Sequence, residues 1–215
     1  MTKRYQDFVI AKGKLIGDFK GLYENFDDPW NQSSDDHKWD SRRIIATNYC
    51  SRLRKKYNSN KVVELGCGFG YITENLRLNN FESIGTDISN AAIEKAKKLH
   101  PESNYLEMNF NDYEKLFDLN PDILIMAEIT WYVLDDLDNF LNEIKNFAKN
   151  KKTPTFLIHL LATYELGVQK YGADKFTNLD EILKYFNLDY LEYGFVKTKT
   201  EFDENSQGTY FVAKI

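Results

Sequence analysis

Residues 64–70 have the sequence Glu64-Leu-Gly-Cys-Gly-Phe-Gly70, and this stretch decides the fold. It overlaps an apolar, β-branched run at 61–65 and precedes a segment, 71–79, with apolar residues at helical spacing. Glycines let the backbone turn tightly here and approach a ligand without Cβ atoms in the way. A strand, a glycine loop and a helix in this order predict a ligand site at the carboxyl end of a parallel sheet.

Segments with strand and helix patterns alternate along the rest of the chain. The expected strands are 61–65, 81–86, 104–110, 122–126, 155–159, 190–200 and 209–215, and the expected helices are 71–79, 91–100, 134–149 and 179–186. Such alternation predicts an α/β fold, a doubly wound sheet of seven strands with helices on both faces. The last two strands are joined by the polar turn 203–208, which predicts a C-terminal antiparallel hairpin.

Length and composition favour one domain over 1–215, with a helical N-terminal cover at 1–60 and a Rossmann-like core at 61–215. The net charge of -5 argues against a general nucleic-acid binder. No apolar run reaches the length of a membrane span, and the start of the chain lacks a signal-peptide pattern. Cys50 and Cys67 fit no metal-ligand spacing, so we expect a cytoplasmic protein that binds neither a membrane nor a metal.

The glycine spacing is G-x-G-x-G, with Tyr71 where a dinucleotide fingerprint has its last glycine. This shortened pattern favours an adenosylmethionine moiety over a pyrophosphate cofactor. Asp87 ends the next expected strand, about twenty residues past the loop, where an acidic side chain accepts hydrogen bonds from ribose hydroxyls. The alternative is that Asp87 only caps the helix expected at 91–100.

The loop, together with the acidic residue before it, resembles motif I of the class I S-adenosylmethionine-dependent methyltransferases, and the sheet plan with its terminal hairpin is similar to theirs. The resemblance implies S-adenosylmethionine as cofactor and S-adenosylhomocysteine as product. It implies that Asn109 and Phe110 hold the adenine and that Ile88 packs on its face, although a strand-end turn and ordinary core packing are the alternatives. The implied cofactor contacts in the loop and strand are Glu64, Gly66, Cys67, Gly68, Gly70 and Asp87.

Two N-terminal segments narrow the resemblance. Asp27-Asp-Pro-Trp30 and Trp39-Asp-Ser-Arg-Arg43 resemble the region that covers the cofactor in NodS-like small-molecule methyltransferases. By this resemblance Trp30 walls the site and Arg42 holds the methionine carboxylate through a charge-assisted hydrogen bond. The alternative for Arg42 is a solvated helix face. The insert at 31–36 is particular to this chain, so the acceptor is not transferred from that group.

Candidate groups for the methyl-transfer step follow the fourth and fifth strands. Glu128 is a candidate general base or a contact to the cofactor's amino group, and His159 is a second candidate base. A satisfied structural histidine is the alternative for His159. Residues expected to shape the acceptor site, with core packing or surface decoration as alternatives, are His37, Trp131, Tyr132, Tyr164, Gln169, Lys170 and Tyr171.

These observations predict metal-independent methyl transfer to an oxygen or nitrogen atom of a small molecule by a monomer or homodimer. The resemblance points to precursors of bacterial surface polysaccharides or capsules, either nucleotide-linked sugars or a phosphoramidate. Two alternatives remain open. A catalytically inactive partner subunit would keep the cofactor loop, and a nicotinamide-dependent oxidoreductase would share the fold, although the shortened glycine pattern disfavours it.

Overall fold

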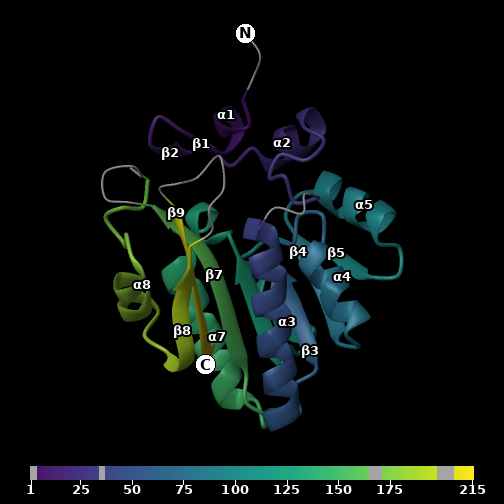
Figure 1. Ribbon diagram of the computed structural model, residues 1–215, viewed down its shortest axis with the longest axis vertical. Coiled ribbons are helices and arrows are strands. Elements are labelled where there is room, and N and C mark those ends of the chain that lie inside the picture. Colours follow the sequence, from purple (N-terminus) through teal and green to yellow (C-terminus); the bar gives the residue numbers. More distant parts are fainter. Residues whose placement is uncertain (1–3, 34–36, 165–170, 198–205) are drawn as a thin grey trace.

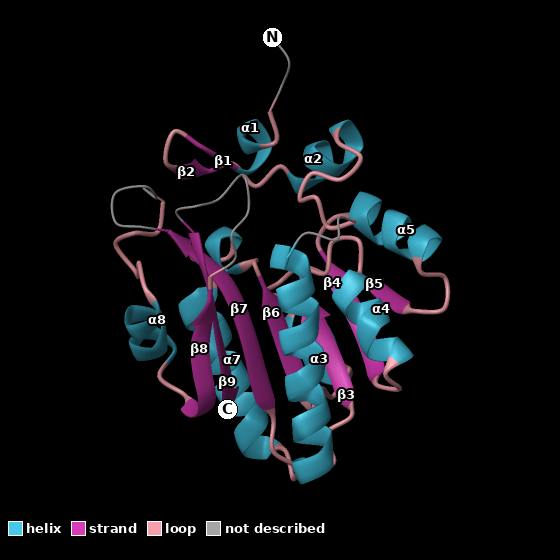
Figure 2. Cartoon of the chain, viewed as in Figure 1, coloured by secondary structure: helices cyan, strands magenta, loops and turns pink. Residues whose placement is uncertain are grey.

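The structure is a computed structural model that describes residues 4–33, 37–164, 171–197 and 206–215. Its centre is a seven-stranded sheet with the strand order β5-β4-β3-β6-β7-β9-β8 (Figure 2). Five of these strands are parallel: β5 (Asn104–Glu107), β4 (Glu82–Asp87), β3 (Lys61–Leu65), β6 (Ile123–Ala127) and β7 (Phe156–Tyr164). The strand β9 (Ser206–Lys214) lies antiparallel between β7 and β8 (Asp189–Val196). The predicted fold class, including the C-terminal hairpin, is confirmed.

Helices cover both faces of the sheet (Figure 1). On one face, α3 (His37–Tyr57) and α4 (Tyr71–Leu78) pack against β3, β6 and β7 through a buried apolar cluster. On the other face, a second cluster joins the sheet to α6 (Tyr113–Asp118), α7 (Leu137–Asn150) and α8 (Leu179–Phe186). The helix α5 (Asn90–Leu99) packs beside β4 and β5. Because β6 is paired on both edges and covered on both faces, all five of its residues are buried.

The N-terminal elements lie across the end of the sheet where β4, β6 and β7 finish (Figure 1). They are α1 (Gln6–Val9), β1 (Ile10–Ala11), β2 (Lys14–Leu15) and α2 (Phe19–Asn25). Lys95 of α5 attaches this cover to the core, since its Nζ donates to the carbonyl oxygens of Phe26 and Asp27 at 3.0 and 3.2 Å. The cover therefore consists of residues before α3. The boundary expected at residue 60 falls too late, because α3 belongs to the packed core.

The elements predicted from the sequence occur in the predicted order, with several differences in their bounds. β5 ends at Glu107 rather than at 110, whereas β7 continues to Tyr164 because β9 pairs with it along its whole length. Some short elements were not predicted from the sequence. They are α6, the 3-10 helix Thr130–Tyr132 and the hairpin β1–β2, whose turn residues Lys12 and Gly13 both have positive φ, as a tight hairpin requires.

Candidate active site

A pocket of about 420 Å³ lies between the carboxyl ends of the central strands and the N-terminal cover. This volume is in the range of small-molecule and cofactor sites. The strand ends supply its floor through Leu65, Gly66, Thr86, Asp87, Ile88, Met108, Asn109, Phe110, Asn111, Ala127, Glu128 and Ile129. Its other walls come from Tyr5, Leu15, Gly17, Phe19, Tyr23, Trp30, Gln32, Trp39, Trp131, Tyr132, Val133 and Asp136.

The glycine loop after β3 is shaped by the protein around it. Gly66 has φ +67° and faces the pocket, and a Cβ at this position would collide with Ile129. The amides of residues 67–70 are all bonded internally: to Thr86, Asp87, Gln32 and Cys67. The loop therefore offers close backbone approach at Gly66, while the four amides of residues 67–70 are not free to bind an anion. A pyrophosphate site would need such donors, so this geometry disfavours a dinucleotide.

Asp87 ends β4 at the pocket floor and is 8% exposed. Its Oδ2 accepts from the Gly68 amide at 3.0 Å, and its Oδ1 accepts from the Ser89 amide at 2.9 Å. Burial raises the pKa of this carboxyl, and the amide hydrogen bonds oppose that shift. The helix α5 is capped by Ser89, whose Oγ accepts from Ala92, so Asp87 is not that helix's cap. Each carboxylate oxygen has a second lone pair with which to accept a ribose hydroxyl.

The wall expected for the adenine is present beside Asp87. Ile88, Asn109 and Phe110 all line the pocket, and Ile88 is 49% exposed although its side chain is apolar. An exposed apolar side chain at the mouth of a pocket suits the flat face of a base. Phe110 is fixed from behind by Phe140, with ring centroids 4.6 Å apart.

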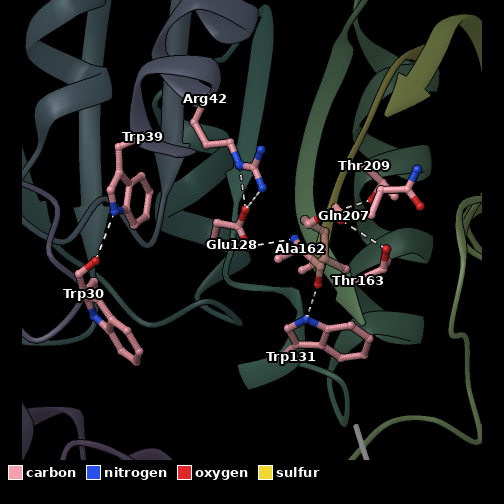
Figure 3. Close-up of polar contacts among 10 residues, drawn as sticks. Trp30, Trp39, Arg42, Glu128, Trp131, Ala162, Thr163, Gln207 and Thr209 are labelled. Carbon is pink, nitrogen blue, oxygen red and sulfur yellow. Dashed lines mark hydrogen bonds and ion pairs between the residues drawn. The ribbon is translucent and has the colours of Figure 1, made fainter. Parts of the chain in front are cut away.

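Aromatic side chains of the cover close the pocket from above. Trp30 lines it, as the sequence predicts, and its Nε1 donates to the Tyr23 hydroxyl at 2.9 Å. The Trp39 indole donates to the Trp30 carbonyl at 3.0 Å, which ties the cover to α3 (Figure 3). Gln32 reaches over the glycine loop, and its Oε1 accepts from the Phe69 amide at 2.9 Å.

Glu128 lies on the pocket floor between α3 and β7 (Figure 3). Its Oε1 accepts two hydrogen bonds from Arg42, one of them from Nε at 2.6 Å, and its Oε2 accepts from the Ala162 amide at 2.8 Å. Arg42 is 3% exposed and does not line the pocket. The structure thus gives Arg42 a protein partner rather than the open position expected for holding a cofactor carboxylate. The alternative of a solvated helix face is also wrong, because Arg42 is buried and forms an ion pair with Glu128.

The segment after Glu128 forms the 3-10 helix Thr130–Tyr132. Trp131 and Tyr132 both line the pocket, as predicted for an acceptor site. The Trp131 Nε1 donates to the Ala162 carbonyl at 3.0 Å (Figure 3). The Tyr132 ring packs on Trp30 with centroids 5.5 Å apart. Both rings are therefore held by the protein before any ligand binds.

His159 does not reach the pocket, and its predicted role as a base is wrong in this geometry. The His159 side chain is fully buried in the core and does not line the pocket. Its ring stacks on that of Phe211, with centroids 4.7 Å apart. Its Nε2 lies 2.7 Å from the Thr130 Oγ1. Burial lowers the pKa of His159 to about 3, so the imidazole is neutral and has no route to an acceptor.

Glu64 and Cys67 also lie outside the pocket, unlike the cofactor contacts that the sequence predicts for them. Glu64 points away from the pocket and accepts a hydrogen bond from the Thr73 hydroxyl of α4, and burial raises its pKa to about 8. Cys67 is buried with its Sγ 3.7 Å from the Gly68 carbonyl oxygen. Gly68 and Gly70 shape the loop without lining the pocket.

The remaining acceptor candidates lie either outside the described residues or outside the lining of the pocket. Gln169 and Lys170 lie outside the described residues, as do the side chains of His37 at the start of α3 and Tyr164 at the end of β7. Tyr171 packs against the apolar cluster beneath α7 and α8 and does not line the pocket. Within the described parts of the chain, no group of three His, Cys, Asp or Glu side chains is arranged to hold a metal. None of the described helices is both long and apolar enough to span a membrane.

Several lining residues were missed by the sequence analysis. Phe19, Tyr23, Gln32, Trp39 and Asp136 belong to the pocket. Aromatic clustering in the first 40 residues was the available signal for Phe19 and Tyr23. No local pattern marks Gln32, because its role depends on a loop 37 positions away.

Comparisons with known proteins agree with this geometry. Residues 63–152 match the family model of the methyltransferase domain. No curated protein sequence matches the chain. Among solved structures, the N-methyltransferase NodS from Bradyrhizobium japonicum WM9, in complex with S-adenosylhomocysteine, is 16% identical with a TM-score of 0.61, and the match covers 90% of this chain and 97% of NodS.

Two further structures share the fold. The magnesium protoporphyrin IX methyltransferase from Synechocystis PCC 6803, with bound S-adenosylhomocysteine, is 15% identical with a TM-score of 0.58, and the match covers 91% of this chain and 97% of that one. The bifunctional kinase-methyltransferase WbdD is 16% identical with a TM-score of 0.63; the match covers 86% of this chain but 42% of WbdD. Residues 63–152 are therefore similar to a methyltransferase domain, and the chain as a whole shares the class I, Rossmann-like fold of these methyltransferase structures.

Proposed function

We propose that this chain transfers the methyl group of S-adenosylmethionine to a nitrogen or oxygen atom of a small molecule. The observation that carries the proposal is the pocket between the glycine loop, Asp87 and the aromatic cover, at the strand ends of a methyltransferase domain. S-adenosylmethionine, when bound, supplies an electrophilic methyl group on a sulfonium. The chain's own residues bind it, align the acceptor and exclude water.

The residues present fit such a cofactor. Asp87 is positioned for the ribose, Ile88 and Phe110 for the adenine, and Gly66 for close approach of the methionine portion. The methyl group is then expected on the side of Glu128 and Tyr132, below the cover. The solved relatives crystallised with S-adenosylhomocysteine support this assignment through the shared fold.

We propose that the acceptor is a precursor of a bacterial surface polysaccharide or capsule, either a nucleotide-linked sugar or a phosphoramidate, as the resemblance in the sequence implies. The fold shared with NodS and WbdD is compatible with it. We propose action on a free small molecule, as monomer or homodimer, without nucleic acid. The aromatic acceptor side of the pocket disfavours an inactive partner subunit, which would have no need of one.

The test is calorimetric titration of the purified protein with S-adenosylmethionine, S-adenosylhomocysteine, NAD⁺ and NADPH. Binding of the first two at about 10⁻⁶ M, with none of the nicotinamide cofactors, is the expected result. Asp87→Asn should weaken both interactions, whereas Asp189→Asn, on the exposed start of β8, is the matched control and should change neither. Binding of a nicotinamide cofactor in place of S-adenosylhomocysteine would overturn the proposal.

A further inference from the structure

Hydrogen bonds from β7 hold the segment that follows β6. The Leu160 carbonyl accepts from the Glu128 amide at 2.8 Å, and the Ala162 amide donates to the Glu128 carboxylate at 2.8 Å (Figure 3). A further bond joins two side chains, His159 of β7 and Thr130 of the segment. The bonds at Leu160 and Ala162 use backbone groups, which any residue supplies. The bond at His159 depends instead on the identity of one β7 side chain.

Both partners of this side-chain bond are fully buried, and the His159 Nε2 lies 2.7 Å from the Thr130 Oγ1. A hydroxyl donates to a bare imidazole nitrogen or accepts from its N–H, so the bond forms with either tautomer. The other ring nitrogen, Nδ1, has no hydrogen-bond partner among the described residues. The ring packs against Phe186 and Phe211, with centroids 4.7 Å from each. A leucine would fill this apolar space without a buried unpaired nitrogen, which is costly, so what the imidazole adds is the bond to Thr130.

Thr130 begins the 3-10 helix that carries two rings of the pocket wall. Trp131 and Tyr132 follow it, and both line the pocket. The Tyr132 ring also packs on Phe19 and Trp30 of the cover, with centroids 5.4 and 5.5 Å away. The position of Thr130 therefore sets the position of both rings and, through Tyr132, their contact with the cover.

We propose that His159 is a positioning residue of the pocket: its bond to Thr130 fixes the turn that carries Trp131 and Tyr132. A hydrogen bond requires a given distance and direction, whereas apolar packing is not directional. The inference rests on the proposed function, because it gives a side chain outside the pocket a part in binding the cofactor and the acceptor. His159 then acts through the wall rather than as a base.

The test removes the bond without leaving a polar atom unpaired. His159→Leu alone leaves the Thr130 hydroxyl unpaired, and Thr130→Val alone leaves a second imidazole nitrogen unpaired, so each single variant should be less stable than the wild type. The double variant has neither fault and should unfold in urea near the wild-type midpoint. Its affinity for S-adenosylhomocysteine in calorimetry should nevertheless fall about fivefold, because the apparent Kd rises as the fraction of molecules with the wall in place falls.

A second measurement needs no ligand. The Trp131 indole N–H, bonded to the Ala162 carbonyl, should exchange with solvent at least about tenfold faster in the double variant, as followed by NMR, because the turn opens without global unfolding. His159→Gln should restore both exchange and affinity, since its side-chain amide reaches the position of the imidazole Nε2. His159→Asn reaches only the position of Nδ1 and should restore neither. Thr209→Val is the matched control, because it removes a buried hydroxyl that donates to the Leu161 carbonyl of β7 without carrying the wall, and it should change neither measurement.

The outcomes distinguish this inference from the proposed function. Failure of the wild type to bind S-adenosylhomocysteine would refute the proposed function, and the indole exchange would still test the role of His159. A double variant with wild-type exchange, or with faster exchange and unchanged affinity, would overturn the positioning role. A glutamine variant that behaves like the asparagine variant would overturn it as well, because the bond to Thr130 would then not be what holds the wall.

Discussion

Replacing Arg42 by methionine is the most direct test of how the site is held together. The guanidinium is 3% exposed and makes two hydrogen bonds to one carboxylate oxygen of Glu128. Methionine replaces the aliphatic part of the side chain and removes the charged guanidinium group. The carboxylate is then left without its cation at a position where its side chain is 13% exposed.

Removal of one partner from a fully buried ion pair costs about 3–5 kcal/mol of stability. Glu128 keeps the Ala162 amide as a donor and its side chain is 13% exposed, so we expect a smaller cost than for a fully buried pair, about 2–3 kcal/mol. In a chain of this size each kcal/mol lowers the midpoint of thermal unfolding by about 2–4 °C, which gives a fall of about 4–12 °C. Glu128→Gln should cost less, because its amide oxygen still accepts from Arg42.

Urea denaturation of the two single variants and the double variant measures the coupling between the residues. The double variant should be more stable than the sum of the single effects implies, by about 1–2 kcal/mol. Arg52→Met is the matched control: it removes another arginine of α3 from another glutamate, Glu192, in a pair whose side chains are 57% and 40% exposed. That control should be close to wild type, since exposed ion pairs contribute little. If Arg42→Met is equally close to wild type, or the cycle is additive, the pair does not hold the site.

Three further outcomes follow from buried ionisable groups. Asp87→Asn should weaken S-adenosylhomocysteine binding by about tenfold or more in calorimetry, because charged hydrogen bonds are lost; unchanged affinity would remove its ribose role. His159 has a folded pKa of about 3, below its unfolded value, so stability should fall as pH drops from about 6.5 toward 3, by up to about 1.4 kcal/mol per unit, and His159→Leu should flatten that slope in urea titrations. Glu64 has a folded pKa of about 8, above its unfolded value, so its contribution to the free energy of unfolding is full below about pH 4.5 and is lost as the pH rises toward 8. Glu64→Gln should therefore be more stable than the wild type at pH 8 in the same urea titrations. A less stable variant would contradict a buried, neutral Glu64.

The fold was predictable because its strands are short apolar runs bounded by glycine, aspartate or proline, and its helices carry clear stop and start residues. The hairpin β1–β2 was not predicted, because each of its strands has only two residues and so shows no alternating pattern. The end of β7 was not predicted correctly, because the length of this strand depends on its pairing with β9. The paired residues are more than 40 positions apart, and such distant pairing leaves no local pattern in the sequence.

The site was predictable where position along a strand was enough. Gly66, Asp87, Ile88 and Asn109 follow or end strands at the carboxyl edge, and all of them line the pocket. The face of a strand was not predictable, because β6 and β7 are buried on both sides and show no alternation of polar and apolar residues. His159 was therefore assigned to the pocket although its side chain lies in the core.

Glu128 is the residue at which three elements of the site meet, and its contacts explain why Arg42 is turned away from the pocket. It is not a glycine, yet it has φ +62°, a conformation that costs about 1 kcal/mol or more and persists only where neighbours hold it. Its amide donates to the Leu160 carbonyl, and its carboxylate is held by Arg42 and Ala162, so β6, β7 and α3 meet at this residue. The carboxylate at the pocket floor is thus held in a fixed position rather than left free to take a proton. A carboxylate held in this way contributes to the site by position, because it keeps the pocket floor fixed where the ligands must be aligned.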